Sequence, residues 1–207
     1  MKDIRLRYFR IALFSVFFAL TVYYIALPFF SPSELHLDIR LPLWVFYTIQ
    51  TNFFVCIWYG FILFSLISRN EKLLSQLVSM SLTVYILLTG IVYWAVLVPM
   101  LGAAPALFLF RNIWTHAITP LFTLYCFLVF SDKGKINAKR VPLILLYPFL
   151  YLLFSYLYVF PLYGRYPYPF LNPDIMGGVL PVVLSITGMV AIFMAIAYFL
   201  RFLHNKN

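Results

Sequence analysis

The sequence predicts an all-α polytopic membrane protein: a bundle of six transmembrane helices with both termini on the cytoplasmic side. Three observations support this fold class. Of the 207 residues, 64% are hydrophobic and only 10% are charged, against roughly 45–50% and 25% in soluble domains. Six apolar runs are each long enough to cross a bilayer. Lysines and arginines gather in alternate connections between these runs.

The six runs follow one another with short connections, so we expect one membrane domain over residues 1–207 and no soluble domain. The first run exceeds the h-region of a signal peptide and is interpreted as a span. The fourth run is the shortest. Residues 161–178, before the last run, contain four prolines and cannot be helical throughout. The predicted spans are residues 9–30, 44–67, 77–101, 113–130, 141–160 and 179–203.

The distribution of basic residues predicts the orientation of the bundle. With a cytoplasmic amino terminus, the outer connections hold only Arg40, Arg111 and Arg165, and the other twelve of the 15 lysines and arginines lie inside. This is the positive-inside pattern of membrane proteins. It also accounts for the net charge of +9, so we exclude nucleic acid as a partner.

Polar residues concentrate at two predicted helix starts near the outer face. The second span opens with YTIQTN, which includes Thr48, Thr51 and Asn52, and the fourth span carries Asn112 and His116 near its start. At about 1.5 Å rise per residue, Thr48 and His116 lie roughly 4–6 Å below the same interface. We therefore expect the two side chains to face each other there.

Each of these residues also has a purely structural interpretation. A threonine in a membrane helix usually bonds its own backbone carbonyl four residues back. An intramembrane asparagine often joins two helices, and a histidine near the interface can bond lipid headgroups. Ser75, Ser79 and Thr83, spaced by four residues, are typical of a helix-packing face.

The residue inventory excludes several other chemistries. The predicted spans contain one histidine, two separated cysteines and no acidic residue, whereas a metal site needs about three converging ligands. No glycine-rich phosphate loop is present. We therefore expect no metal and no cofactor, which leaves a hydroxyl nucleophile and an imidazole base as the available catalytic groups.

Three motifs carry a resemblance to a known family. YTIQTN, THAITP in the fourth span and RYPYPFLNP before the last span together resemble the Pr6Pr family of bacterial six-pass membrane proteins. That family is distantly similar to the androgen-induced (FAR-17a type) membrane proteins, which are threonine hydrolases of fatty acid esters of hydroxy fatty acids. The resemblance implies the bacterial cytoplasmic membrane, with Thr48 as nucleophile, His116 as partner and Pro120 as landmark. The hydrolases carry asparagine three residues after the threonine; here Thr51 stands there and Asn52 follows, so Thr51 is an alternative equivalent.

The resemblance implies a mechanism for hydrolysis of a lipid ester. His116 would take the proton of Thr48 during attack on the ester carbonyl, and water would then hydrolyse the acyl-threonine. Asn52, Asn112 or a tyrosine would orient His116.

In that mechanism Arg111, Arg40 or Arg165 would hold a carboxylate or phosphate of the substrate. The alternatives are a non-catalytic protein that binds or transports a lipid or small amphiphile in the same pocket, and a structural partner in a larger membrane complex that docks on the face of Ser75, Ser79 and Thr83.

Overall fold

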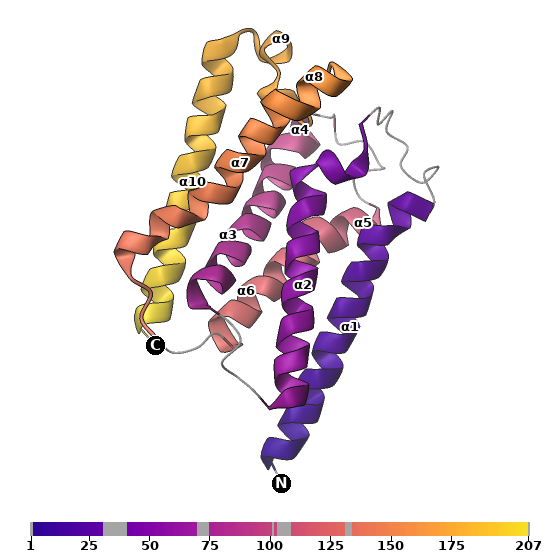
Figure 1. The fold of residues 1–207 in the computed structure, drawn as a ribbon, viewed down its shortest axis with the longest axis vertical. Coiled ribbons are helices and arrows are strands. Elements are labelled where there is room, and N and C mark those ends of the chain that lie inside the picture. The colour runs from indigo at the N-terminus through magenta and orange to yellow at the C-terminus, as the bar shows by residue number, and fades with distance from the viewer. Residues whose placement is uncertain are drawn as a thin grey trace.

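The computed structural model describes residues 2–30, 41–69, 75–100, 102, 109–130 and 134–206. All regular structure within these ranges is helical, and six helical rods are long and apolar enough to cross a membrane (Figure 1). The chain is therefore an integral multi-pass membrane protein, and the predicted fold class is confirmed. The membrane-crossing segments are Leu6–Ala26, Tyr47–Ser68, Gln76–Met100, Phe110–Val129, Ala138–Tyr163 and Val179–Lys206.

Three rods are single α-helices, and the other three each contain a π-helical segment of five residues. The single helices are α1 (Lys2–Phe30), α2 (Tyr47–Ser68) and α10 (Val179–Lys206). The third rod consists of α3 (Gln76–Val92), the π-segment η4 (Tyr93–Leu97) and α4 (Val98–Met100). The fourth consists of α5 (Phe110–Ile113), the π-segment η6 (Trp114–Ile118) and α6 (Thr119–Phe130). The fifth consists of the 3-10 helix η7 (Ala138–Leu145), α7 (Leu146–Phe154), the π-segment η8 (Ser155–Val159) and α8 (Phe160–Tyr163).

Each π-segment ends two residues before a proline: Pro99, Pro120 and Pro161. A proline inside a helix has no N–H for the carbonyl four residues earlier, and its ring clashes with that carbonyl. Widening the preceding turn to i→i+5 hydrogen bonds relieves this conflict, and such π-bulges often occur at functional sites. The prolines therefore account for the position of all three π-segments.

The observed helix boundaries differ from the predicted ones where backbone conformation, and not hydropathy, determines the first residue of the helix. The second span was expected from residue 44, but Leu43–Val45 form a short 3-10 turn, η2, and Phe46 is extended, so α2 starts at Tyr47. The fourth rod starts at Phe110 and the fifth at Ala138, three residues earlier than predicted in each case. Polar first turns extend these helices beyond their apolar runs.

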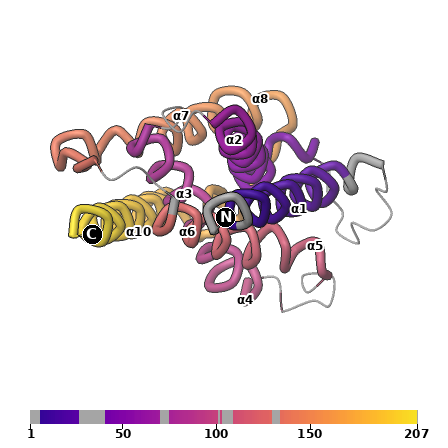
Figure 2. The backbone as a smooth tube through the Cα atoms, turned by 90° about the horizontal axis from the view of Figure 1, so that it is seen from below, coloured from indigo at the N-terminus to yellow at the C-terminus, as the bar shows by residue number. Residues whose placement is uncertain are grey.

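The rods form a bundle in which α1 and α10 lie on opposite sides (Figures 1 and 2). Helix α1 packs along α2, while α10 packs on α3 and η7. Both termini lie at the same end of the bundle, as six crossings require (Figure 1). We call this the basic end, because Lys135, Lys139 and Arg140 lie there. The other end is the loop end, where residues 164–178 form the 3-10 helix η9 (Pro169–Leu171) and the short helix α9 (Pro173–Met176) between bends.

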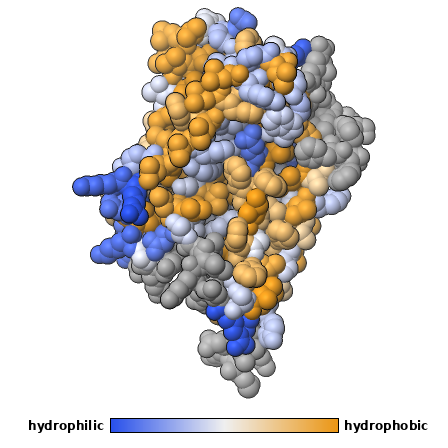
Figure 3. Space-filling view, in the orientation of Figure 1, coloured by the Kyte–Doolittle hydropathy of each residue, from blue (hydrophilic) through white to orange (hydrophobic). Residues whose placement is uncertain are grey.

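Apolar side chains fill the interior and also cover the outside. Phe14 of α1, Tyr59 of α2 and Phe122 of α6 pack together through tilted and edge-to-face ring contacts. On the outside, Leu180 and Leu184 of α10 are among many exposed apolar residues. The hydrophobic colour spreads over the body of the bundle in Figure 3. This surface is suited to contact with lipid chains.

The predicted packing face of the third span lies inside the bundle. Ser79 and Thr83 are buried, and their hydroxyls donate to the carbonyls of Ser75 and Ser79, at 3.2 and 2.8 Å. Most of this face is therefore filled by the chain's own helices and does not offer a seam to another protein.

Candidate functional site

The first turn of α2 is held by tyrosines from distant parts of the chain. Phe46 supplies no capping side chain, so the first N–H groups of the helix need other acceptors. The Tyr151 hydroxyl accepts from the Tyr47 N–H at 3.1 Å and donates to the Val45 carbonyl at 2.9 Å. The Tyr168 hydroxyl accepts from the Thr48 N–H at 3.2 Å. These two phenols replace an N-cap and fix the start of α2 against α7 and the loop end.

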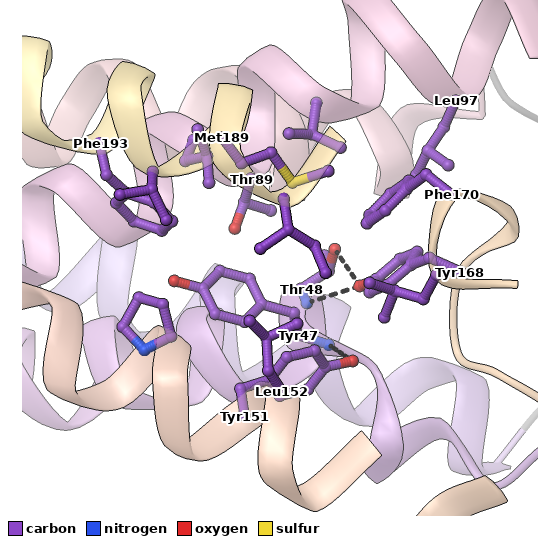
Figure 4. A pocket seen from close by; sticks show the side chains of 16 residues that line it. Tyr47, Thr48, Thr89, Leu97, Tyr151, Leu152, Tyr168, Phe170, Met189 and Phe193 are labelled. Atoms are coloured by element: carbon purple, nitrogen blue, oxygen red, sulfur yellow. Dashed lines mark hydrogen bonds between the residues drawn. The ribbon is translucent and has the colours of Figure 1, made fainter. Parts of the chain in front are cut away.

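A cavity of about 80 Å³ lies beside this helix start, between α2, α3, α7, η9 and α10 (Figure 4). Its wall is largely apolar, with Leu88, Leu152, Phe170, Met189 and Phe193 among the side chains that form it. The polar groups on the wall are Tyr47, Thr48, Thr89, Tyr151 and Tyr168. A mostly apolar pocket with a few convergent polar groups is the usual form of a small-molecule site.

Tyr47 is a buried tyrosine of this wall whose hydroxyl has no hydrogen-bond partner among the residues that the structure describes. Its ring packs against those of Tyr147 and Tyr151, at centroid distances of 5.2 and 5.0 Å. An unsatisfied buried hydroxyl costs about 1–3 kcal/mol.

Thr48 lies on the cavity wall, half-buried, as a nucleophile would require. Its hydroxyl is 3.4 Å from the Tyr168 hydroxyl (Figure 4). Burial raises the pKa of the Tyr168 phenol above its usual value. The phenol is therefore protonated at neutral pH and cannot serve as the base for Thr48.

His116 lies in η6 and faces η4. Its Nδ1 is 2.9 Å from both the Thr115 hydroxyl and the Asn112 carbonyl oxygen. Its ring stacks on Tyr93 with centroids 3.6 Å apart. The chain therefore brings together the residues of two π-segments, which sequence reasoning did not anticipate.

The predicted contact between Thr48 and His116 is not formed. Both residues are described, and the hydrogen bonds of their side chains go to different partners. His116 is also absent from the cavity wall that contains Thr48. The physical reason is that the Thr48 hydroxyl contacts Tyr168 at the loop end. The wide turn of η6 places the His116 ring on Tyr93 instead.

Polar residues of the second and fourth spans nevertheless make contact one helical turn after Thr48. The Asn52 side-chain amide donates to the carbonyls of Thr48 and Thr115, at 2.9 and 3.3 Å. The Asn52 Oδ1 atom is buried with no partner among the described residues. Thr51 donates to the Tyr47 carbonyl and lies 3.0 Å from the Thr89 hydroxyl of α3. These residues thus link α2 to α3 and η6, which is the interhelical role expected of polar side chains in membranes.

Of the remaining predicted residues, the structure describes Arg111, Asn112 and Arg165. Asn112 contributes its carbonyl to His116, and the Arg111 carbonyl accepts from the Thr115 hydroxyl at 3.0 Å. Arg165 is exposed in the bend after α8. Arg40 lies outside the described residues. Neither Arg111 nor Arg165 forms part of the cavity wall.

Sequence reasoning missed the tyrosines that build the site. Tyr168 belongs to RYPYPFLNP, which the sequence analysis identifies only as a family motif. The close succession of prolines and tyrosines is a usable signal, because it fixes an irregular backbone that can place Tyr168 and Phe170 over α2. Nothing in the local sequence indicates the role of Tyr151.

The described residues contain no group of three histidine, cysteine or acidic side chains that could hold a metal ion. Cys56 and Cys126 are buried free thiols. Comparison of the chain with family models, curated proteins and solved structures finds no match. The resemblance to the Pr6Pr family therefore stays a prediction from the three motifs.

Proposed function

We propose that this protein binds a lipid-like amphiphile in the cavity beside α2. The observation that carries the proposal is an apolar cavity whose lining includes Tyr47, a tyrosine whose buried hydroxyl has no partner among the described residues. The apolar wall suits a hydrocarbon chain, and the hydroxyl is a donor for an oxygen acceptor on that chain. Membrane lipids are the available source of such a molecule.

We infer that the cavity opens toward the surrounding lipid at α10. Val190 forms part of its wall and is 36% exposed. An engineered apolar cavity of about 150 Å³ accommodates benzene, so 80 Å³ accommodates only a short chain segment. The ligand would therefore enter laterally, leaving the rest of its chain between α10 and the surrounding lipid.

Thermal unfolding in detergent tests the binding. A long-chain fatty acid methyl ester should raise the melting temperature of the wild-type protein, because a ligand that binds only the folded state stabilises it. Val190→Trp fills the opening and should abolish the rise. Leu184→Trp, at an exposed position of the same helix, is the matched control and should retain it. Equal responses in both variants would refute the cavity as the binding site.

A threonine hydrolase acting on lipid esters is the second candidate, and the position of Thr48 on the cavity wall supports it. An ester bound there would lie within reach of the Thr48 hydroxyl. The base is the missing part, because His116 points to Tyr93 and Tyr168 is protonated. Binding therefore has the stronger support, and hydrolysis would need a rearrangement that brings His116 to the cavity.

A covalent hydrolase probe separates the two candidates. A catalytic protein should be labelled on Thr48, and Thr48→Ala should lose both the label and ester hydrolysis. Thr187→Ala, at an exposed threonine of α10, is the control. Binding of the ester without labelling of Thr48 and without hydrolysis would support the binding function and exclude the hydrolase.

We further propose that the protein resides in the bacterial cytoplasmic membrane with its loop end outside. The concentration of basic residues at the other end and the Pr6Pr resemblance support this placement. The cavity would then lie in the outer half of the membrane.

A further inference from the structure

A second cavity lies at the basic end, where the connection before η7 meets the start of α3. It has a volume of about 290 Å³, far above the roughly 10–15 Å³ that one water molecule needs. In contrast to the cavity beside α2, most of its lining residues are polar. These are Ser75, Gln76, Lys135, Asn137 and Arg140.

The last turns of α10 hold one wall of this cavity in place. Arg201 donates to the Ile136 carbonyl at 2.9 Å. Asn205 binds both backbone groups of Ile136, accepting from its N–H at 3.0 Å and donating to its carbonyl at 3.2 Å. His204 contacts the Gly134 carbonyl at 2.9 Å. The connection is therefore a fixed wall, and the side chains on it are presented at defined positions.

Two cations line the cavity without an anionic partner among the described residues: Lys135 in the connection and Arg140 in η7. The side chains of Lys135 and Arg140 are exposed and form no ion pair or side-chain hydrogen bond there. On the opposite wall, α3 begins at Gln76, and Ser75 provides no side-chain cap. The free N–H groups of a helix start favour an anion. Both walls thus offer positive charge and hydrogen-bond donors to the same space.

We infer that this cavity binds a phosphate group at the membrane surface. A phosphate matches the two cations in charge and can accept hydrogen bonds from the guanidinium and the helix start together. The cavity lies at the ends of two membrane-crossing rods, Gln76–Met100 and Ala138–Tyr163, where lipid headgroups would surround it. Basic pockets between transmembrane helices at the cytoplasmic surface commonly bind anionic lipid headgroups. The inference does not depend on the function proposed for the cavity beside α2.

Native mass spectrometry of the delipidated protein tests the inference with phosphatidylglycerol and phosphatidylcholine as probes. The wild-type protein should retain phosphatidylglycerol in preference to phosphatidylcholine. Lys135→Ala and Arg140→Ala should each weaken that binding about fivefold, since a basic residue near the surface contributes about 1 kcal/mol. Lys139→Ala removes the same charge from an exposed neighbour outside the cavity, and it should leave the affinity near that of the wild type. Lys135→Arg should restore binding.

The source of the phosphate is distinguished by a second titration with inorganic phosphate, followed by the melting temperature. Stabilisation that is lost in Lys135→Ala but kept in Lys139→Ala would show that a free phosphate is sufficient. Selective binding of phosphatidylglycerol without that effect would assign the site to a lipid headgroup. Equal losses in all three alanine variants would indicate diffuse surface attraction and overturn the inference. Unchanged affinity in Lys135→Ala and Arg140→Ala, with melting temperatures like the wild type, would also overturn it.

Discussion

Two tyrosines of α2 show how one hydroxyl can be either a structural or a functional group. The Tyr59 hydroxyl lies 2.6 Å from that of Thr123, so two buried polar groups satisfy each other across α2 and α6. The Tyr47 hydroxyl is equally sheltered but has no partner among the described residues. Buried polar groups are rarely left unpaired in folded proteins. Tyr47 therefore carries one of the few unpaired buried polar atoms among the described residues, and it is the one that belongs to the proposed ligand site.

The two tyrosines should therefore respond oppositely to removal of the hydroxyl. Tyr47→Phe should stabilise the ligand-free protein by about 1–3 kcal/mol, because it removes an unsatisfied donor. Tyr59→Phe should destabilise it by about 0.5–1.5 kcal/mol, because it removes a net favourable hydrogen bond. Thermal unfolding of both variants in detergent measures the difference. Loss of stability in Tyr47→Phe would mean that its hydroxyl already has a partner.

For single residues, the sequence predicted which side chains are polar and how far below the membrane surface they lie. It did not predict the direction of each side chain. Thr51 and Asn52 do connect α2 to its neighbours. Thr48 and His116 do not meet, because the direction of each side chain depends on contacts with Tyr168 and Tyr93. These contacts join segments far apart in the chain. Helical spacing carries no information about them.

Among the elements, η6 shows how a proline shapes the interior. Pro120 leaves the His116 carbonyl without its usual helical N–H donor. Trp94 donates to that carbonyl at 3.2 Å instead. Helix α3 can approach this point because residue 90 is glycine: a Cβ there would be 2.6 Å from the His116 carbonyl oxygen. Gly90 and Pro120 are thus parts of one close helix contact.

Replacement of Gly90 should break this contact. We expect Gly90→Ala to lower stability by about 1–3 kcal/mol, as for other overpacked interiors, since the atom it meets is backbone and cannot turn aside. Gly188→Ala is the matched control, because nothing lies within 4 Å of its added Cβ. The control should be neutral or slightly stabilising. Equal melting temperatures for the two variants would show that α3 and η6 are not packed this closely.

Hydropathy predicted the existence and order of all six rods because a membrane span must be long and apolar. Hydropathy could not place the ends of the rods. Phe46, for example, is apolar but has an extended backbone and therefore precedes α2. The three π-segments were also missed. Prolines in spans signal a local disturbance, but whether it becomes a kink or a π-turn depends on neighbours such as Trp94.

For the whole molecule, the positive-inside pattern predicts which end faces the cytoplasm. Lys139→Cys and Arg165→Cys place single exposed thiols at the basic end and the loop end, and the native Cys56 and Cys126 are buried. In intact cells a membrane-impermeant maleimide should label Arg165→Cys only. Lys139→Cys should react after permeabilisation. The reverse pattern would invert the bundle and move the cavity beside α2 to the cytoplasmic half.

Photoaffinity labelling in lipid nanodiscs is the sharpest test of amphiphile binding in the cavity beside α2. The probe is a long-chain ester with a diazirine on its hydrocarbon chain, and mass spectrometry maps the labelled residues. We predict labels on cavity residues such as Met189 and Phe193, lost in Val190→Trp and kept in Leu184→Trp. Labels confined to exposed residues such as Leu180, and unchanged in Val190→Trp, would show that the ester does not enter the cavity.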